Sequence, residues 1–122
     1  MIKRYSKSDK VLYIQDDAGE IRKLEFETQI FDCLLYDNSL IVYVGNNSTY
    51  LGRNIFRISE DGRIVWQVEE PQPYLGTGAG RSVAFSHLGL NQEGRIIGYS
   101  LNCFTYEIDF ETGKLSNPVF TK

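Results

Sequence analysis

The stretch NIFRISEDGRIVWQV, residues 54–68, contains the structural unit from which we expect the whole chain to be built. An apolar segment runs into an acidic turn that ends at Gly62, and a second apolar segment follows it. In that second segment Ile64, Trp66 and Val68 are spaced to share one face of an extended strand. Because glycine readily takes the positive φ that a tight turn needs, the stretch predicts a β-hairpin.

The same hairpin pattern occurs three times along the chain. Gly19, Gly62 and Gly113 end the three turns and lie 43 and 51 residues apart. Repeats at this spacing are typical of propeller blades. The sequence therefore predicts a series of blade-like units: a half blade at 11–26, a four-stranded unit at 30–68 and another at 82–120.

The predicted fold class is all-β, a single domain over residues 1–122 made of antiparallel hairpin repeats. The repeats amount to about two and a half propeller-like four-stranded blades, and we expect no helix. Closed propellers typically use four to eight blades, so this set cannot close by itself. We expect an open or sandwich-like partial propeller in a monomer, and a homo-oligomer that completes a ring is the alternative.

Composition and charge narrow the classes of protein further. The formal net charge of −3 argues against a dedicated nucleic-acid binder, which would present a basic face. The first residues do not resemble a signal peptide, and the apolar run at 40–44 is far too short to span a membrane. Cys33 and Cys103 lack metal-binding or redox spacing, which predicts free thiols. We therefore expect a cytoplasmic protein with no membrane or nucleic-acid partner.

Residues 54–68 resemble the repeats of quinoprotein-type (PQQ) β-propellers, which pair such a strand with a tryptophan on the returning strand. In this chain Trp66 holds that position. The resemblance implies a fold unit and not an activity. No residues here can be matched to the cofactor and metal ligands of quinoprotein enzymes, so we expect no dehydrogenase activity and no cofactor.

Residues 30–122 as a whole are similar to small bacterial proteins of polymorphic or contact-dependent toxin loci. The matching segments are residues 66–71, which read WQVEEP, residues 106–114, which read YEIDFETGK, and residues 120–122, which read FTK. The resemblance implies an immunity protein that neutralises a cognate toxin domain by stoichiometric binding. Such a protein covers the toxin rather than transforming it chemically.

We find no catalytic apparatus in the sequence. His87 is the single histidine, and its spacing from Val83 and Phe85 is typical of a structural, partly buried strand residue. No Gly-x-Ser-x-Gly motif is present. The glycine-rich residues 76–82 lack the lysine and the following helix of a phosphate loop, which favours a plain connector. The sequence predicts a protein that is not an enzyme and has no catalytic residues and no metal site.

Acidic turns and loop aromatics are the candidates for partner binding, because they could cover a basic cleft of a toxin. These residues are Asp16, Asp17, Tyr50, Glu60, Asp61, Glu69, Glu70 and Tyr74. The alternative function is that of an oligomeric propeller-like scaffold or a ligand-binding module without catalysis.

Overall fold

The computed structural model describes residues 1–71, 84–101 and 103–120, and these contain eleven β-strands and no helix. The strands form three antiparallel sheets. The first sheet holds β1 (Ile2–Ser8), β2 (Val11–Asp16) and β3 (Ile21–Glu25). The second holds β4 (Ile30–Tyr36), β5 (Ser39–Val44), β6 (Ile55–Ile58) and β7 (Ile64–Gln67). The third holds β8 (Phe85–Leu90), β9 (Ile96–Ser100), β10 (Phe104–Ile108) and β11 (Leu115–Phe120).

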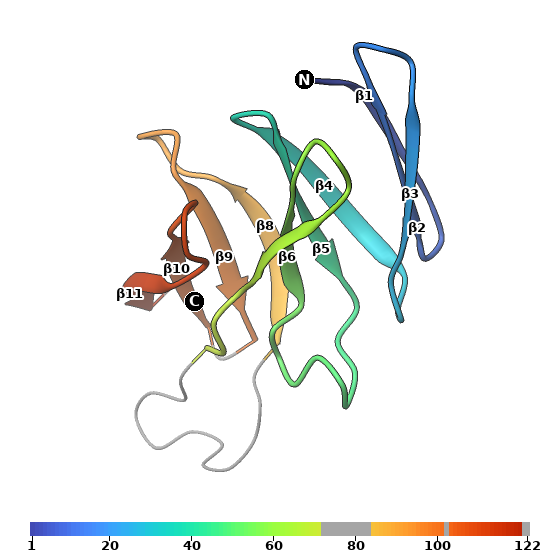
Figure 1. Ribbon diagram of the computed structural model, residues 1–122. Helices are drawn as coiled ribbons and strands as arrows, with labels where there is room; N and C mark the ends of the chain where they lie inside the picture. The colour runs from blue at the N-terminus through green and yellow to red at the C-terminus, as the bar shows by residue number, and fades with distance from the viewer. Residues whose placement is uncertain (72–83, 102, 121–122) are drawn as a thin grey trace.

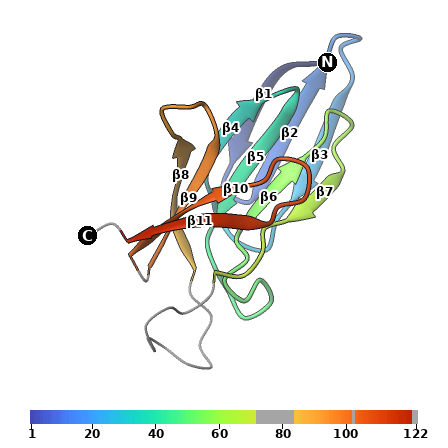
Figure 2. The same ribbon diagram turned by 90° about the vertical axis from the view of Figure 1, so that its left-hand side faces the viewer.

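Within each sheet the strands follow one another in chain order, and every pairing is between consecutive strands. The three sheets stand side by side in the order in which the chain forms them (Figure 1). The strands of the third sheet run at a clear angle to those of the first (Figure 2), as the twist of β-sheets leads one to expect. The predicted all-β antiparallel architecture is confirmed, and the sheets are open rather than closed into a ring.

The second sheet is buried on both faces, and β5 shows this most clearly. Leu40, Val42 and Val44 belong to a core shared with the first sheet. Ile41 belongs to a second core shared with the third sheet, and Tyr43 packs against that core. A strand covered on both sides needs apolar residues at successive positions, which explains the uninterrupted apolar run at 40–44.

The hairpin turns form where the glycines predict them. Gly19, Gly62 and Gly113 adopt φ values of 85°, 80° and 77°. The turn between β4 and β5 uses two residues of positive φ instead, Asp37 and Asn38. That is the pattern of a type I′ turn, whose twist matches the twist of the two strands.

β1 is a strand that the sequence pattern did not predict. Only Ile2 in this strand is buried, and the other six residues are exposed, so no alternation of polar and apolar residues marks it. Beside its pairing with β2, one long-range contact fixes the start of this strand and a second fixes the turn that follows it. The Ile2 amide donates to the side chain of Asn38 at 2.8 Å, and the Asp9 carbonyl accepts from the Ile30 amide at 2.8 Å.

β-bulges change the face on which two predicted strand residues lie. The register shifts between Phe85 and His87, so His87 leaves the face of the buried Phe85 and becomes exposed. A second shift places Ile64 opposite Ile58 and Trp66 opposite Arg57, which puts Ile64 and Trp66 on opposite faces. A bulge inserts one residue into a strand and thereby reverses the alternation that follows.

The third sheet docks on the second through the β10–β11 turn. The Trp66 indole Nε1 donates to the Phe110 carbonyl at 2.7 Å, and the Arg57 guanidinium donates to the same oxygen at 2.8 Å. The Trp66 ring lies directly over Gly113, where an added Cβ would come within 2.8 Å of ring carbons. Gly113 is therefore required both by its backbone conformation and by the close approach of the ring.

We expect Gly113→Ala to destabilise the protein by roughly 1–3 kcal/mol more than Gly94→Ala, because only the first creates a steric overlap. The control is closely matched, since Gly94 ends another turn at the same φ of 77° with nothing within 4 Å of an added Cβ. Urea unfolding of the two variants measures the difference. Equal losses would show that the contact between Trp66 and Gly113 does not constrain this turn.

Candidate functional site

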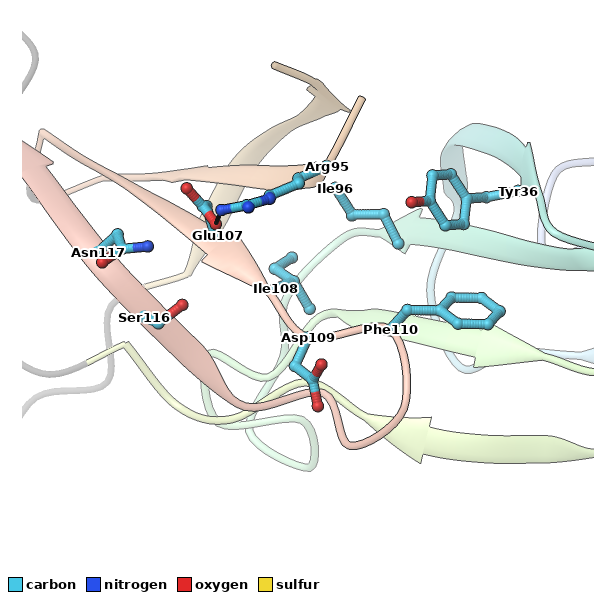
Figure 3. A pocket seen from close by; sticks show the side chains of 9 residues that line it. All are labelled: Tyr36, Arg95, Ile96, Glu107, Ile108, Asp109, Phe110, Ser116 and Asn117. Atoms are coloured by element: carbon cyan, nitrogen blue, oxygen red, sulfur yellow. Dashed lines mark hydrogen bonds and ion pairs between the residues drawn. The ribbon is translucent and has the colours of Figure 1, made fainter. Parts of the chain in front are cut away.

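One pocket lies where the end of β4 meets the third sheet (Figure 3). Its volume is about 400 Å³. Hydrophobic side chains of β9 and β10 form part of its wall, and polar side chains of β10 and β11 line the rest. The lining residues are Tyr36, Arg95, Ile96, Glu107, Ile108, Asp109, Phe110, Ser116 and Asn117.

Polar groups of this pocket come from a bulged edge strand and from an ion pair. Arg95 Nη1 and Glu107 Oε1 lie 3.0 Å apart. The register of β11 against β10 shifts between Thr105 and Glu107, and Asn117 in the shifted segment has a φ of 50°. The side chains of Ser116 and Asn117 are exposed and have no hydrogen-bond partner in the described part of the chain. Bulges on edge strands often redirect a side chain in this way.

The wall opposite the polar groups is aromatic. The rings of Tyr36 and Phe110 pack at a centroid distance of 5.2 Å, and the guanidinium carbon of Arg57 lies 3.7 Å from the centre of the Phe110 ring. These contacts connect the pocket to the docking of the β10–β11 turn. The pocket therefore has the volume and the polar groups to accept a small polar molecule beside this aromatic wall.

Four of the predicted acidic residues come together at a second site, which we call the acidic end. It consists of Asp16, Asp17, Glu60 and Asp61, which line a pocket of about 310 Å³ together with Met1, Ala18 and Arg22. The acids belong to the β2–β3 and β6–β7 turns, which are neighbours because the first and second sheets pack together. Arg22 lies against Gly62, where an added Cβ would come within 3.2 Å of its side chain.

Hydrogen bonds hold the carboxylates of the acidic end in place. Asp16 Oδ1 accepts from the amides of Ala18 and Glu20, each at 3.0 Å. Glu60 is bonded to the terminal ammonium of Met1 and accepts from Asn38 at 2.9 Å, and in that order these contacts lower the pKa of its carboxyl. Hydrogen bonds to charged groups of this kind are the stronger ones in proteins.

The acidic end keeps its negative charge near neutral pH and presents it to solvent. The pKa of Asp61 is also lowered, mainly by the hydrogen bond from Ser59. The side chain of Asp17 is 65% exposed, and those of Glu60 and Asp61 are about half exposed. Arg22 and the terminal ammonium line the pocket, and Arg63 pairs with Asp61 at 3.3 Å. Four carboxylates therefore meet three cations, which leaves a small excess of negative charge.

Glu69 and Glu70 do not join the acidic end, because they lie beyond the other end of β7. Glu69 has a structural role: its Oε1 accepts from the Leu115 amide at 3.0 Å, and its own amide donates to the Gly113 carbonyl. Both glutamates line a separate pocket of about 380 Å³, whose other residues include Arg53 and Lys114.

The sequence also named two loop aromatics, Tyr50 and Tyr74, as candidates for partner binding. Tyr50 is only 8% exposed, so the prediction that its ring is available to a partner is wrong. Its ring packs against Phe56 at 5.2 Å, and its hydroxyl oxygen accepts from the Glu27 amide at 2.8 Å. The loop folds inward and uses the ring to fill the core between the first two sheets. Tyr74 lies outside the described residues.

His87 is the remaining candidate group, and it lies in β8. His87 is exposed, its Nδ1 lies 3.3 Å from Ser86 Oγ, and its ring packs against Tyr99. Among residues 1–71, 84–101 and 103–120, no three His, Cys, Asp or Glu side chains converge as metal ligands do. Nor does the described chain contain a helix with the length and hydropathy needed to cross a bilayer.

Comparisons with known proteins define a family and a fold. Residues 2–120 match the family described as Domain of unknown function (DUF7957), and the chain belongs to that family. No curated protein matches the sequence. Among solved structures, the computationally designed Ika8 protein is similar, with a TM-score of 0.54 at 10% identity. The match covers 99% of this chain and 37% of the designed one, so this chain spans little more than a third of that protein's length.

Cys33 lies beside the core between the first two sheets, and its burial raises the pKa of the thiol to about 11. Because the thiolate is the reactive form, we expect Cys33 in a Cys103→Ser variant to react with iodoacetamide at pH 8 about a hundredfold more slowly than the same thiol in the unfolded chain. The rate should rise about tenfold per pH unit until the pH approaches that pKa. Equal rates in native buffer and in urea would contradict the raised pKa.

Proposed function

We propose that this protein is an immunity-type protein that neutralises a cognate bacterial toxin by stoichiometric binding, with the acidic end as its contact surface. The observation that carries the proposal is the convergence of four carboxylates from two hairpin turns on one exposed pocket. A basic cleft in a toxin that acts on an anionic substrate is the complementary surface. We place the encounter in the cytoplasm, where a protein of this kind protects its own cell.

Pre-organisation supports this surface as a binding site. Asp16 and Asp61 accept hydrogen bonds within their own turns, and Glu60 accepts one from Asn38 of a neighbouring turn. A carboxylate that is already oriented loses little conformational freedom on binding. A compact patch of one sign also raises the rate of association with a partner of opposite sign.

We further propose that the three sheets are propeller-like blades built on the quinoprotein type of hairpin repeat. The support is the repeated relation between consecutive sheets. Arg22 of the first sheet lies on Gly62 of the second, and Trp66 of the second sheet lies on Gly113 of the third. In each case the returning strand of one sheet contacts the glycine turn of the next.

Neutralisation by this protein requires no chemistry of its own, since covering an active site is sufficient. Two observations favour binding over catalysis. The raised pKa of Cys33 keeps that thiol protonated near neutral pH. Within residues 1–71, 84–101 and 103–120, the His87 ring contacts Ser86 and Tyr99 and no carboxylate. We therefore expect the inhibitor and the toxin to act in a one-to-one complex.

Co-expression with the C-terminal domain encoded by the gene immediately upstream should restore growth that this domain otherwise abolishes, and the two proteins should purify together. Asp17→Lys combined with Asp61→Lys should abolish protection and weaken binding by at least about tenfold, because like charges then face each other across the interface. The control is Glu93→Lys, which reverses an exposed acid in a turn of the third sheet.

Growth and titration calorimetry separate the outcomes. A toxic domain that kills regardless of this protein, with no complex detected, would refute the pairing. Loss of protection in the Glu93→Lys control to the same extent as in the double variant would show that the effect is one of overall charge. In that case the acidic end is not the contact surface.

A second candidate function is that of a ligand-binding module without catalysis, and the pocket of Figure 3 favours it. Its bulged strand directs unpaired polar groups toward an ion pair beside an aromatic wall. A fragment screen by NMR should then shift the signals of Asn117 and Arg95 together, and Arg95→Ala should weaken the binding of any hit. Shifts scattered over unrelated surfaces would count against this function.

A further inference from the structure

The first sheet is one strand shorter than its two neighbours. In the second and third sheets, two strands precede the hairpin that carries the glycine turn: β4 and β5 in one, β8 and β9 in the other. In the first sheet only β1 precedes it. Among residues 1–71, 84–101 and 103–120, no strand takes the position that corresponds to β4 and β8, and β1 forms an edge of the first sheet. Such an edge presents backbone N–H and C=O groups that can pair with another strand.

Apolar surface of β4 is exposed on the face directed toward the first sheet. On one face of β4, Leu34 and Tyr36 pack against the core shared with the third sheet. On the other face Leu35 lies opposite Leu40, which belongs to the core shared with the first sheet. Leu35 is nevertheless 48% exposed. Side chains that lie directly opposite one another share a face, so Leu35 is directed toward the first sheet.

The free edge of β1 contributes side chains to the same space. Tyr5 lies opposite Ile14 and Lys7 lies opposite Leu12, and both partners are buried toward the second sheet. Tyr5 and Lys7 themselves are exposed. The positive charge of Lys7 lies close enough to the Cys33 thiol to oppose the effect of burial on its pKa. Cys33 lies on β4, two residues before Leu35.

The charge of β1 selects the kind of strand that fits. Lys3, Arg4 and Lys7 lie in this strand, and it contains no acidic residue. None of the three cations forms an ion pair within the described residues. Pairing of β1 with β1 of a second copy would place these cations close together, which is unfavourable, whereas an acidic strand would neutralise them.

We propose that the free edge of β1, together with Leu35 and Tyr5, binds an extended acidic segment of a partner protein, which adds as the fourth strand of the first sheet. Main-chain hydrogen bonds to β1 supply the affinity, as in other cases of strand addition. Arg4 lies on the outer face of β1, and Tyr5 and Lys7 lie on the face directed toward the second sheet. Acidic side chains of the segment meet Arg4 on the outer face, and its alternate apolar side chains cover Leu35 and Tyr5 on the other face. The charge of Lys7 adds to the attraction of an acidic segment. The inference concerns a surface other than the acidic end and does not depend on the proposed function.

The probe is a blocked eight-residue peptide that alternates glutamate with valine, and the control peptide has lysine in place of each glutamate. Titration calorimetry should show binding of the acidic peptide at least tenfold tighter than that of the basic one. Hydrogen exchange should show new protection of amides in β1. That protection should be absent from β11, the outer edge strand of the third sheet.

Variants locate the site. Two variants should each weaken the binding of the acidic peptide by at least tenfold. One combines Arg4→Glu with Lys7→Glu, and the other is Leu35→Asp. Lys23→Glu on β3 and Leu90→Asp on β8 are the matched controls, since they change an exposed lysine and a similarly exposed leucine elsewhere. Thermal unfolding verifies that each variant is folded.

Four results would overturn the inference. They are the absence of saturable binding at millimolar peptide, equal binding of the two peptides, protection of amides outside β1, and a dimer that already occupies this edge. The hydrogen-exchange result on the unmodified protein decides the matter even if a variant fails to fold.

Discussion

Burial of the second sheet on both faces is the constraint on which the rest of the structure depends. β5 carries apolar side chains at successive positions. Alternate side chains point to opposite faces of the sheet, so they enter two different cores. Water must therefore be excluded from both sides of this sheet, and one neighbouring sheet can cover only one side. The first and third sheets are both required for the same reason, and in the part of the chain that the structure describes each shares a core with the second sheet.

The contacts between sheets also determine where the candidate sites lie. A side chain of the returning strand contacts the glycine turn of the next sheet: Arg22 lies against Gly62, and Trp66 lies against Gly113. The first contact brings the two acidic turns together, and the second helps to form the aromatic wall of the pocket in Figure 3. The candidate sites are therefore consequences of how the sheets dock, and substitutions at these glycines affect the sites as well as stability.

The surfaces of most functional interest lie where the repetition is interrupted. The bulge in β11 directs Asn117 into a pocket, and Leu35 is exposed on the face of β4 directed toward the three-stranded first sheet. A regular repeat satisfies its own backbone groups and covers its own apolar faces. Interruptions leave polar groups and apolar surface available, which is why interactions with other molecules are expected there.

The sequence by itself determined the strands and turns whose signals are local. Turn glycines, acidic turns and alternating apolar residues identified the three hairpins, whose glycines adopt the expected positive φ. Tertiary structure alone decided the features that depend on distant residues. β1 has no buried face and is held at its start by Asn38 and at the turn that follows it by Ile30, Tyr50 turns inward because a core needs its ring, and a bulge exposes His87. The acidic residues were named from the sequence, but only the docking of neighbouring sheets decided which four meet, because adjacency in a fold is set by packing between elements and not by spacing along the chain.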